Sequence, residues 1–283
     1  MAAAPPSSPL PQPATTATAR LSRAGGVLGF ALGGFFDGIL LHQVLQWHHL
    51  FSLVPGERWR DIKNQILMDG WFHVLHYLIA VVGLWLLWQA RDELGGEGAG
   101  RRLLGSVLLG FAVWQAVDTV LFHWVLAIHR VRVDMPNPLF WDIGWFVVVG
   151  GPPLVLGFWL RGAGGGGGTR HTATVAAAAL AASVLVAGPV AALPPPGSNA
   201  TVVLFRPGIG AAAFGAVAAI GGRVVWADPS GELLAIETGP EGRAWRLYGH
   251  GALLVGNAAG PFAGTCLAWS RGREAGSGGA RGR

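Results

Sequence analysis

Four stretches of this chain are apolar enough to cross a lipid bilayer, and each carries one aspartate but no lysine, arginine or glutamate. A helix that crosses a bilayer needs roughly 20 apolar residues, and an ionisable side chain in hydrocarbon costs at least about 2.5–3.5 kcal/mol. We therefore expect each acid to be protonated, paired with an imidazolium or bound to a cation. The spans and their acids are residues 26–50 (Asp37), 66–89 (Asp69), 103–128 (Asp118) and 139–160 (Asp142).

The composition supports a membrane protein. Of the 283 residues, 52% are hydrophobic and 12% charged, whereas soluble domains are about 25% charged. A fifth apolar window covers residues 172–193, so we expect an all-α polytopic membrane bundle of four core helices plus a fifth, with the lipid bilayer as its partner. The net charge of +5 lies mostly in loops and tails, and no basic, aromatic-rich face indicates nucleic-acid binding. The single cysteine, Cys266, excludes an intrachain disulfide and a multi-cysteine metal site.

The sequence divides into five regions. Residues 1–22 and 272–283 are expected to be disordered tails. Residues 23–162 form the four-helix module, and residues 172–193 the fifth helix. Strand and helix signals in the order β-α-β-β-α-β predict a small α/β domain with a ferredoxin-like fold over residues 198–271.

The basic residues that flank the spans predict the orientation. Seven of them lie on the side of the N-terminus and five on the other side, which favours a cytoplasmic N-terminus. The protein would then be a multi-pass protein of the cell membrane with an extracytoplasmic C-terminal domain.

Histidines accompany the aspartates at one end of the spans. The first and third helices end on the membrane face where the second and fourth begin. Their polar residues should therefore gather in one half of the bilayer, the outer half in the favoured orientation, while the other half has no ionisable group. The candidate metal ligands are Asp37, His42, His48, His49, Asp69, His73, His76, Asp118, His123 and His129.

The first and third helices share one motif. Asp37-x4-His42-x5-His48 matches Asp118-x4-His123-x5-His129, which is consistent with an internal duplication. On a continuous α-helix, the first and last residues of each motif would differ by only about 20° around the axis. On the second helix, Asp69, His73 and His76 would share one face. Any single intramembrane Asp or His can instead be a packing residue held by a hydrogen bond between helices.

Imidazole and carboxylate ligands suit zinc, copper(II) or iron. The leading hypothesis is therefore a membrane metal-binding protein that serves metal delivery or metalloenzyme assembly. One alternative is a membrane-embedded enzyme in which the metal activates water or oxygen. Another is a haem protein in which His42 and His123 ligate the iron. A third is a structural role, in which the C-terminal domain binds an extracytoplasmic protein partner.

The segment GGFFDGILLHQVLQWHH (residues 33–49), followed by DGWFH (residues 69–73), is distinctive. Over about residues 25–160 the chain resembles a family of predicted bacterial membrane proteins known as domain of unknown function 2243. The resemblance implies a polytopic, histidine-rich membrane module. It implies no particular reaction.

Overall fold

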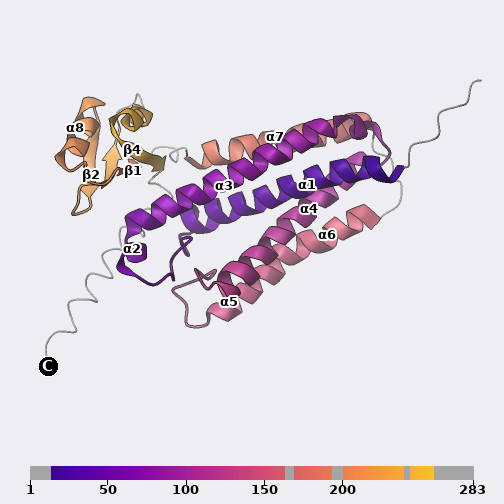
Figure 1. Cartoon of the computed structure of the whole chain (residues 1–283), viewed down its shortest axis with the longest axis horizontal. Coiled ribbons are helices and arrows are strands. Elements are labelled where there is room, and N and C mark those ends of the chain that lie inside the picture. The colour runs from indigo at the N-terminus through magenta and orange to yellow at the C-terminus, as the bar shows by residue number, and fades with distance from the viewer. Residues whose placement is uncertain (1–13, 163–168, 193–199, 239–242, 258–283) are drawn as a thin grey trace, which may run out of the picture.

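The computed structural model describes residues 14–162, 169–192, 200–238 and 243–257. The chain forms a long helical bundle with a small α/β domain at one end (Figure 1). The expected C-terminal tail, residues 272–283, lies outside the described residues, as do residues 1–13.

The bundle contains the helices that the apolar windows predict. Helix α1 (Ala14–Asp37) continues into the π-helix η1 (Gly38–Val44), and α4 (Ala99–Val117) continues into the π-helix η3 (Asp118–Val125). Between them lie α2 (Glu57–Arg60), α3 (Ile62–Gln89) and the 3-10 helix η2 (Arg91–Gly95). Next come α5 (Pro138–Trp145), the π-helix η4 (Phe146–Gly150), α6 (Gly151–Gly162) and α7 (Arg170–Ala192).

Within the described residues, five helical stretches are long and apolar enough to cross a membrane: 19–44, 62–89, 99–125, 138–162 and 170–187. The expected tail is wrong for residues 14–22, because α1 begins at Ala14. Leu21, which lies upstream of the apolar run, is fully buried in the bundle core. Packing therefore extends the helix past the polar residues that mark the start of the apolar run.

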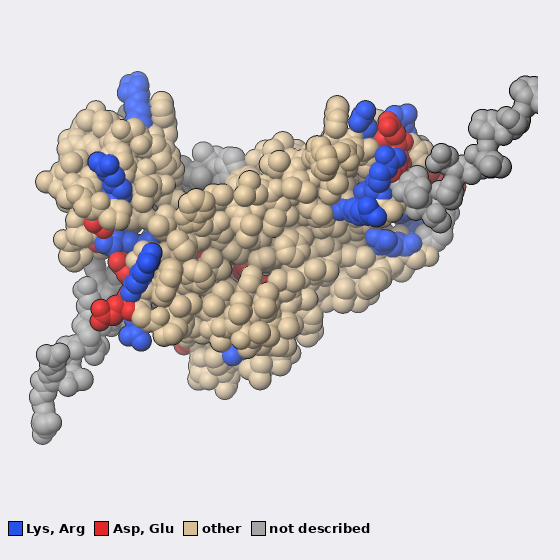
Figure 2. Space-filling model, viewed as in Figure 1, with Lys and Arg blue, Asp and Glu red and all other residues tan. Residues whose placement is uncertain are grey.

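The outer surface of the bundle is apolar. Val81, Trp85 and Phe158 expose 60%, 58% and 63% of their surface, a pattern that suits lipid rather than water. Lysine, arginine, aspartate and glutamate gather at the two ends of the molecule, and the middle of the face in view is almost free of them (Figure 2). An apolar band between charged ends is what a bilayer-spanning bundle requires.

Helices α1 and α4 pack against each other through glycines. A Cβ atom at Gly29 would lie 1.9 Å from the backbone oxygen of Val107, and one at Gly110 would lie 2.0 Å from that of Gly26. Only glycine allows two backbones to approach this closely. The small-residue face of α1 thus fixes α1 and α4 as the central pair, which brings η1 and η3 together.

The C-terminal domain is a four-stranded antiparallel sheet with one α-helix. Its elements are β1 (Ala200–Phe205), α8 (Ala211–Ala219), β2 (Arg223–Ala227), β3 (Leu233–Glu237), the 3-10 helix η5 (Arg243–His250) and β4 (Ala252–Asn257). The strand order is β2-β3-β1-β4. A 3-10 helix stands where a second α-helix was expected, and the ferredoxin-like assignment stays a prediction.

The domain contacts the start of α3. Lys63 Nζ donates hydrogen bonds to Glu232 Oε2 at 2.8 Å and to Ser230 Oγ at 3.0 Å. A Cβ atom at Gly70 would lie 3.1 Å from Leu254 Cδ1. The domain therefore lies at the end of the bundle where α3 begins.

Candidate metal centre

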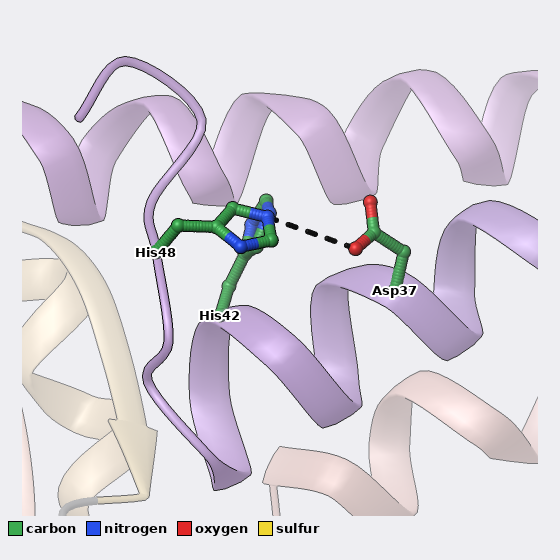
Figure 3. A group of neighbouring side chains, drawn as sticks. All are labelled: Asp37, His42 and His48. Atoms are coloured by element: carbon green, nitrogen blue, oxygen red, sulfur yellow. Dashed lines mark ion pairs between the residues drawn. The ribbon is translucent and has the colours of Figure 1, made fainter. Parts of the chain in front are cut away.

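The π-helix η1 aligns the first group of polar side chains, which we call the first triad: Asp37, His42 and His48. Hydrogen bonds in a π-helix join residues five apart, so His42 stands above Asp37 on the same side of the helix. After η1 the chain turns back at Gln46, whose φ is +51°, and this turn brings His48 over the helix end. His48 Nε2 then lies 3.8 Å from Asp37 Oδ1 (Figure 3).

The expected geometry of this motif is therefore wrong, although its ends do meet. A continuous α-helix to residue 50 was expected to bring Asp37 and His48 onto one line. It would also have separated Asp37 from His42 by about 140°. The π-turn removes that separation, and a loop rather than a helix delivers His48.

The second triad, Asp118, His123 and His129, repeats this construction in η3 and the loop that follows. Ala127 takes the place of Gln46, also with a φ of +51°. His123 Nε2 lies 2.9 Å from Asp118 Oδ2, and His129 Nε2 lies 3.1 Å from Asp118 Oδ1. In each triad, one ligand atom from every residue lies within 4.8 Å of the other two, and all six side chains are buried.

Backbone carbonyls fix the orientation of the two loop histidines. His48 Nδ1 lies 3.0 Å from the carbonyl oxygen of Val131, and His129 Nδ1 lies 2.9 Å from that of Leu50. Because a carbonyl oxygen only accepts, each Nδ1 must carry the hydrogen and donate it. In the neutral rings the lone pair of Nε2 then faces the carboxylate of its own triad.

The triads contain buried polar atoms that lack hydrogen bonds. Burial lowers the pKa of His129 although Asp118 opposes the shift, and its Nε2 lies 3.1 Å from Asp118 Oδ1. Among the described residues, neither carboxylate oxygen of Asp37 and neither ring nitrogen of His42 or His123 has a hydrogen-bond partner of acceptable geometry. Lone pairs that converge without hydrogen bonds are the arrangement that a bound cation stabilises.

Two further aspartates support the helix histidines from outside the triads. His42 Nδ1 lies 3.1 Å from Asp69 Oδ1, and His123 Nδ1 lies 3.1 Å from Asp142 Oδ1. The same two carboxylate oxygens accept hydrogen bonds from the backbone N–H groups of Leu50 and Val131. This leaves Nε2 of each helix histidine for its own triad. An imidazole supported on one nitrogen by a carboxylate is a common outer partner arrangement of metal-binding histidines.

The second carboxylate oxygen, Oδ2, of Asp69 has a different partner from that of Asp142. His49 Nδ1 lies 2.6 Å from Asp69 Oδ2, whereas the Arg130 guanidinium donates to Asp142 Oδ2 at 2.7 Å. The expectation that each span acid is protonated, paired with an imidazolium or bound to a cation therefore missed the ion pair of Asp142 with Arg130. Arg130 lies outside the apolar span in sequence but folds back to it.

The two triads are related by a local two-fold symmetry. The matched contacts pair residues at a constant offset along the chain, from the carbonyl partners of His48 and His129 to the glycine contacts of α1 and α4. The rings of His48 and His129 stack on each other, with centroids 4.6 Å apart and planes 4° from parallel. The duplicated motif thus corresponds to a duplicated network of contacts.

Of the ten candidate residues, six form the triads and two, His49 and Asp69, support the first one. His73 and His76 lie apart. His73 Nε2 is 3.2 Å from Gln43 Nε2, and His76 Nδ1 donates to the carbonyl oxygen of Phe72. Within the described part of the chain, no ion pair joins either ring to a triad.

Sequence reasoning left two residues out of the candidate set, Asp142 and Arg130. Both could have been predicted from the sequence. For Arg130 the indication is the duplicated motif, which places it at the position of His49. The fourth span then supplies one acid, Asp142, at the place where the second supplies Asp69.

Two nitrogens and a carboxylate form a donor set that accepts zinc, copper(II) or iron. Comparison of the chain with curated proteins and with solved structures finds no match. Residues 24–163 match a family model described as "Predicted membrane protein (DUF2243)", and this range covers both triads and the residues that support them. The helical module of this chain, residues 24–163, therefore belongs to the DUF2243 family of predicted membrane proteins.

Proposed function

We propose that this protein is a membrane metalloprotein that binds transition-metal ions at the buried Asp/His triads. One observation carries the proposal: Nδ1 of each loop histidine donates to a backbone carbonyl, so that in the neutral ring Nε2 carries a lone pair, and this atom lies towards an aspartate of its own triad. Unless a proton or a metal ion lies between them, the imidazole and carboxylate lone pairs repel each other in a buried site, and a metal ion can bind several of them at once. Zinc, copper(II) and iron are the metals that fit these ligands.

The burial of the ligands bears on how the metal is used. His42, His48, His123 and His129 expose at most 2% of their surface, and outer partners hold all four rings. A site held in this way favours a metal that stays bound. We therefore place resident binding ahead of delivery of the metal or assembly of another metalloenzyme.

A membrane-embedded metal-dependent enzyme is the second candidate. Each triad supplies three protein ligands, and metal sites with three protein ligands keep a coordination position for water or substrate. This use needs the same metal and differs from pure binding only in turnover.

A haem group has less support from the packing. The His48 ring centroid lies 4.7 Å from that of His42 and 4.6 Å from that of His129, and the His123 and His129 centroids lie 4.8 Å apart. Imidazoles in mutual contact leave no room between them for a porphyrin. An optical spectrum of the purified protein without a Soret band would agree with this argument.

The proposed topology puts the N-terminus in the cytoplasm, from the distribution of basic residues. The triads and the C-terminal domain would then lie towards the outer face. Both are near the start of α3, since Asp69 supports a triad and Lys63 contacts Glu232. A domain at this end of the bundle is suited to bind an extracytoplasmic protein partner.

Elemental analysis of the full-length protein, purified from metal-replete cells, tests the proposal. We expect a stoichiometric transition metal in the wild type and its loss in the double variant His42→Ala/His123→Ala. The matched control is His171→Ala/His250→Ala, which removes two exposed imidazoles away from the triads. A wild type without stoichiometric metal, or a double variant with full metal content, would refute metal binding at the triads.

A further inference from the structure

The two triads raise the question of how many ions the centre holds. Each half of the module supplies its own set of two imidazoles and one carboxylate. The sets come from separate helices: η1 and its loop build the first, and η3 and its loop build the second. All three residues of each triad come from the same half of the module.

The stacked loop histidines separate the two sets. A single ion bound equally by both triads would have to lie on the local two-fold axis. The midpoint of symmetry-related rings lies on that axis, and the His48 and His129 rings stack there 4.6 Å apart. Their Nε2 atoms face different carboxylates, at 3.8 Å from Asp37 Oδ1 and 3.1 Å from Asp118 Oδ1. An ion held by one triad is therefore off the axis and has an equivalent position in the other triad.

The outer partners cross between the halves. His48, a ligand of the first triad, is oriented by the carbonyl of Val131 in the second loop, and His129 is oriented by Leu50 in the first loop. Leu53 N also donates to the carbonyl oxygen of Ile128 at 2.9 Å, which ties the two loops together. Each triad thus takes its ligands from one half of the module, and a backbone carbonyl of the other half orients its loop histidine.

The charges in the centre also accommodate two ions. Four carboxylates are buried here, those of Asp37, Asp69, Asp118 and Asp142, and the guanidinium of Arg130 is the one arginine in contact with them among the described residues. With neutral imidazoles the group carries about three negative charges. Two divalent cations balance this to within one charge.

We propose that the centre is dinuclear: it binds two transition-metal ions, one at Asp37–His42–His48 and one at Asp118–His123–His129, related by the local two-fold symmetry. The inference rests on the proposed metal-binding function.

Metal counting on half-site variants tests the pair. Full-length protein is stripped with a chelator, loaded with zinc chloride, desalted and analysed for zinc per chain. We expect two zinc ions in the wild type, one in Asp37→Asn/His42→Ala, one in Asp118→Asn/His123→Ala, and none in the combination. His76→Ala, which removes a buried imidazole outside both triads, should keep two.

The outcomes separate this inference from the function that it rests on. One zinc ion in the wild type, whether lost in both half-site variants or in only one, would overturn the dinuclear centre and leave metal binding intact. No zinc in the wild type would overturn both.

Electron paramagnetic resonance of the copper(II)-loaded wild type is a second test, one that does not depend on variants that fold. We expect the broadened spectrum of two interacting ions, and the isolated-copper spectrum would contradict the proposal.

Discussion

At the scale of the residue, the centre is defined by which nitrogen of each histidine is already used. Nδ1 of the loop histidines, His48 and His129, donates a hydrogen bond to a backbone carbonyl oxygen. Nδ1 of the helix histidines, His42 and His123, lies against the carboxylates of Asp69 and Asp142. All four therefore present Nε2 to a triad. A single supporting contact decides whether an imidazole is a ligand, which spacing along the sequence does not reveal.

The supporting aspartates should control affinity without binding the metal. Asp69→Asn keeps an acceptor for the Leu50 N–H but removes the charge beside His42, and we expect the affinity for zinc to fall by about 10–100-fold. Competition with a chromophoric chelator measures it. Asp142→Asn should behave in the same way, and Asp92→Asn, an exposed acid in η2, should bind like the wild type. Unchanged affinity in Asp69→Asn would mean that this carboxylate has no part in the site.

The residues of the centre were largely visible in the sequence, whereas their geometry was not. The paired motif gave all six triad residues, because aspartate and histidine are costly in an apolar span. It did not give the π-turns, since an i to i+5 pairing has no signal in hydrophobic periodicity. Nor did it separate His73 and His76 from the ligands, because these rings also face α1 and η1, at Gly34 and Gly38, without joining either triad.

At the scale of the element, two π-helices and one glycine contact determine the site. The π-turns place Asp and His on one side, and the approach of α1 to α4 brings the two turns together. The helical spans themselves follow from composition, although the first helix begins upstream of its apolar window and its helical part ends at Val44. The fold of the small C-terminal domain was harder to predict from the sequence, because short strands and 3-10 turns depend on tertiary packing.

The glycine contact should be sensitive to a single methyl group. In Gly29→Ala the new Cβ would meet the Val107 backbone, which cannot move aside without separating the helices. We expect the free energy of unfolding to fall by about 1–3 kcal/mol, measured as a lower Tm in detergent. Gly110→Ala should have the same effect from the other side. Gly26→Ala is the control because no atom lies within 4 Å of its new Cβ, and equal losses in Gly26→Ala and Gly29→Ala would contradict the close contact.

At the scale of the whole molecule, the polar centre and the soluble domain share one end of an apolar bundle (Figure 1). The opposite half of the bundle is sealed by apolar side chains, with α1, α3 and α4 sharing a core that includes Leu28, Ala80 and Val107. The buried polar groups of the triads therefore lie in the half of the bundle that is nearer to the domain.

The position of the domain can be tested by cross-linking. With Cys266→Ser as background, Gly70→Cys and Leu254→Cys should be joined by a short bismaleimide, because a Cβ atom at residue 70 would lie 3.1 Å from Leu254 Cδ1. Mobility on a denaturing gel after cleavage between the two parts reports the link. Leu253→Cys is the matched control, since neighbouring strand residues point to opposite faces and Leu253 is exposed. Equal cross-linking of both pairs would show that the domain does not sit in this place.

The exchange of His49 for Arg130 makes the two halves electrically unequal. A guanidinium keeps its charge at every pH that the protein meets, whereas an imidazole does not. If the centre binds two cations as proposed, the guanidinium of Arg130 would disfavour the first of them on the Asp142 side, so the Asp37 triad would fill first. On that proposal the two ions would bind in sequence, and the ion beside Arg130 would be the weaker bound.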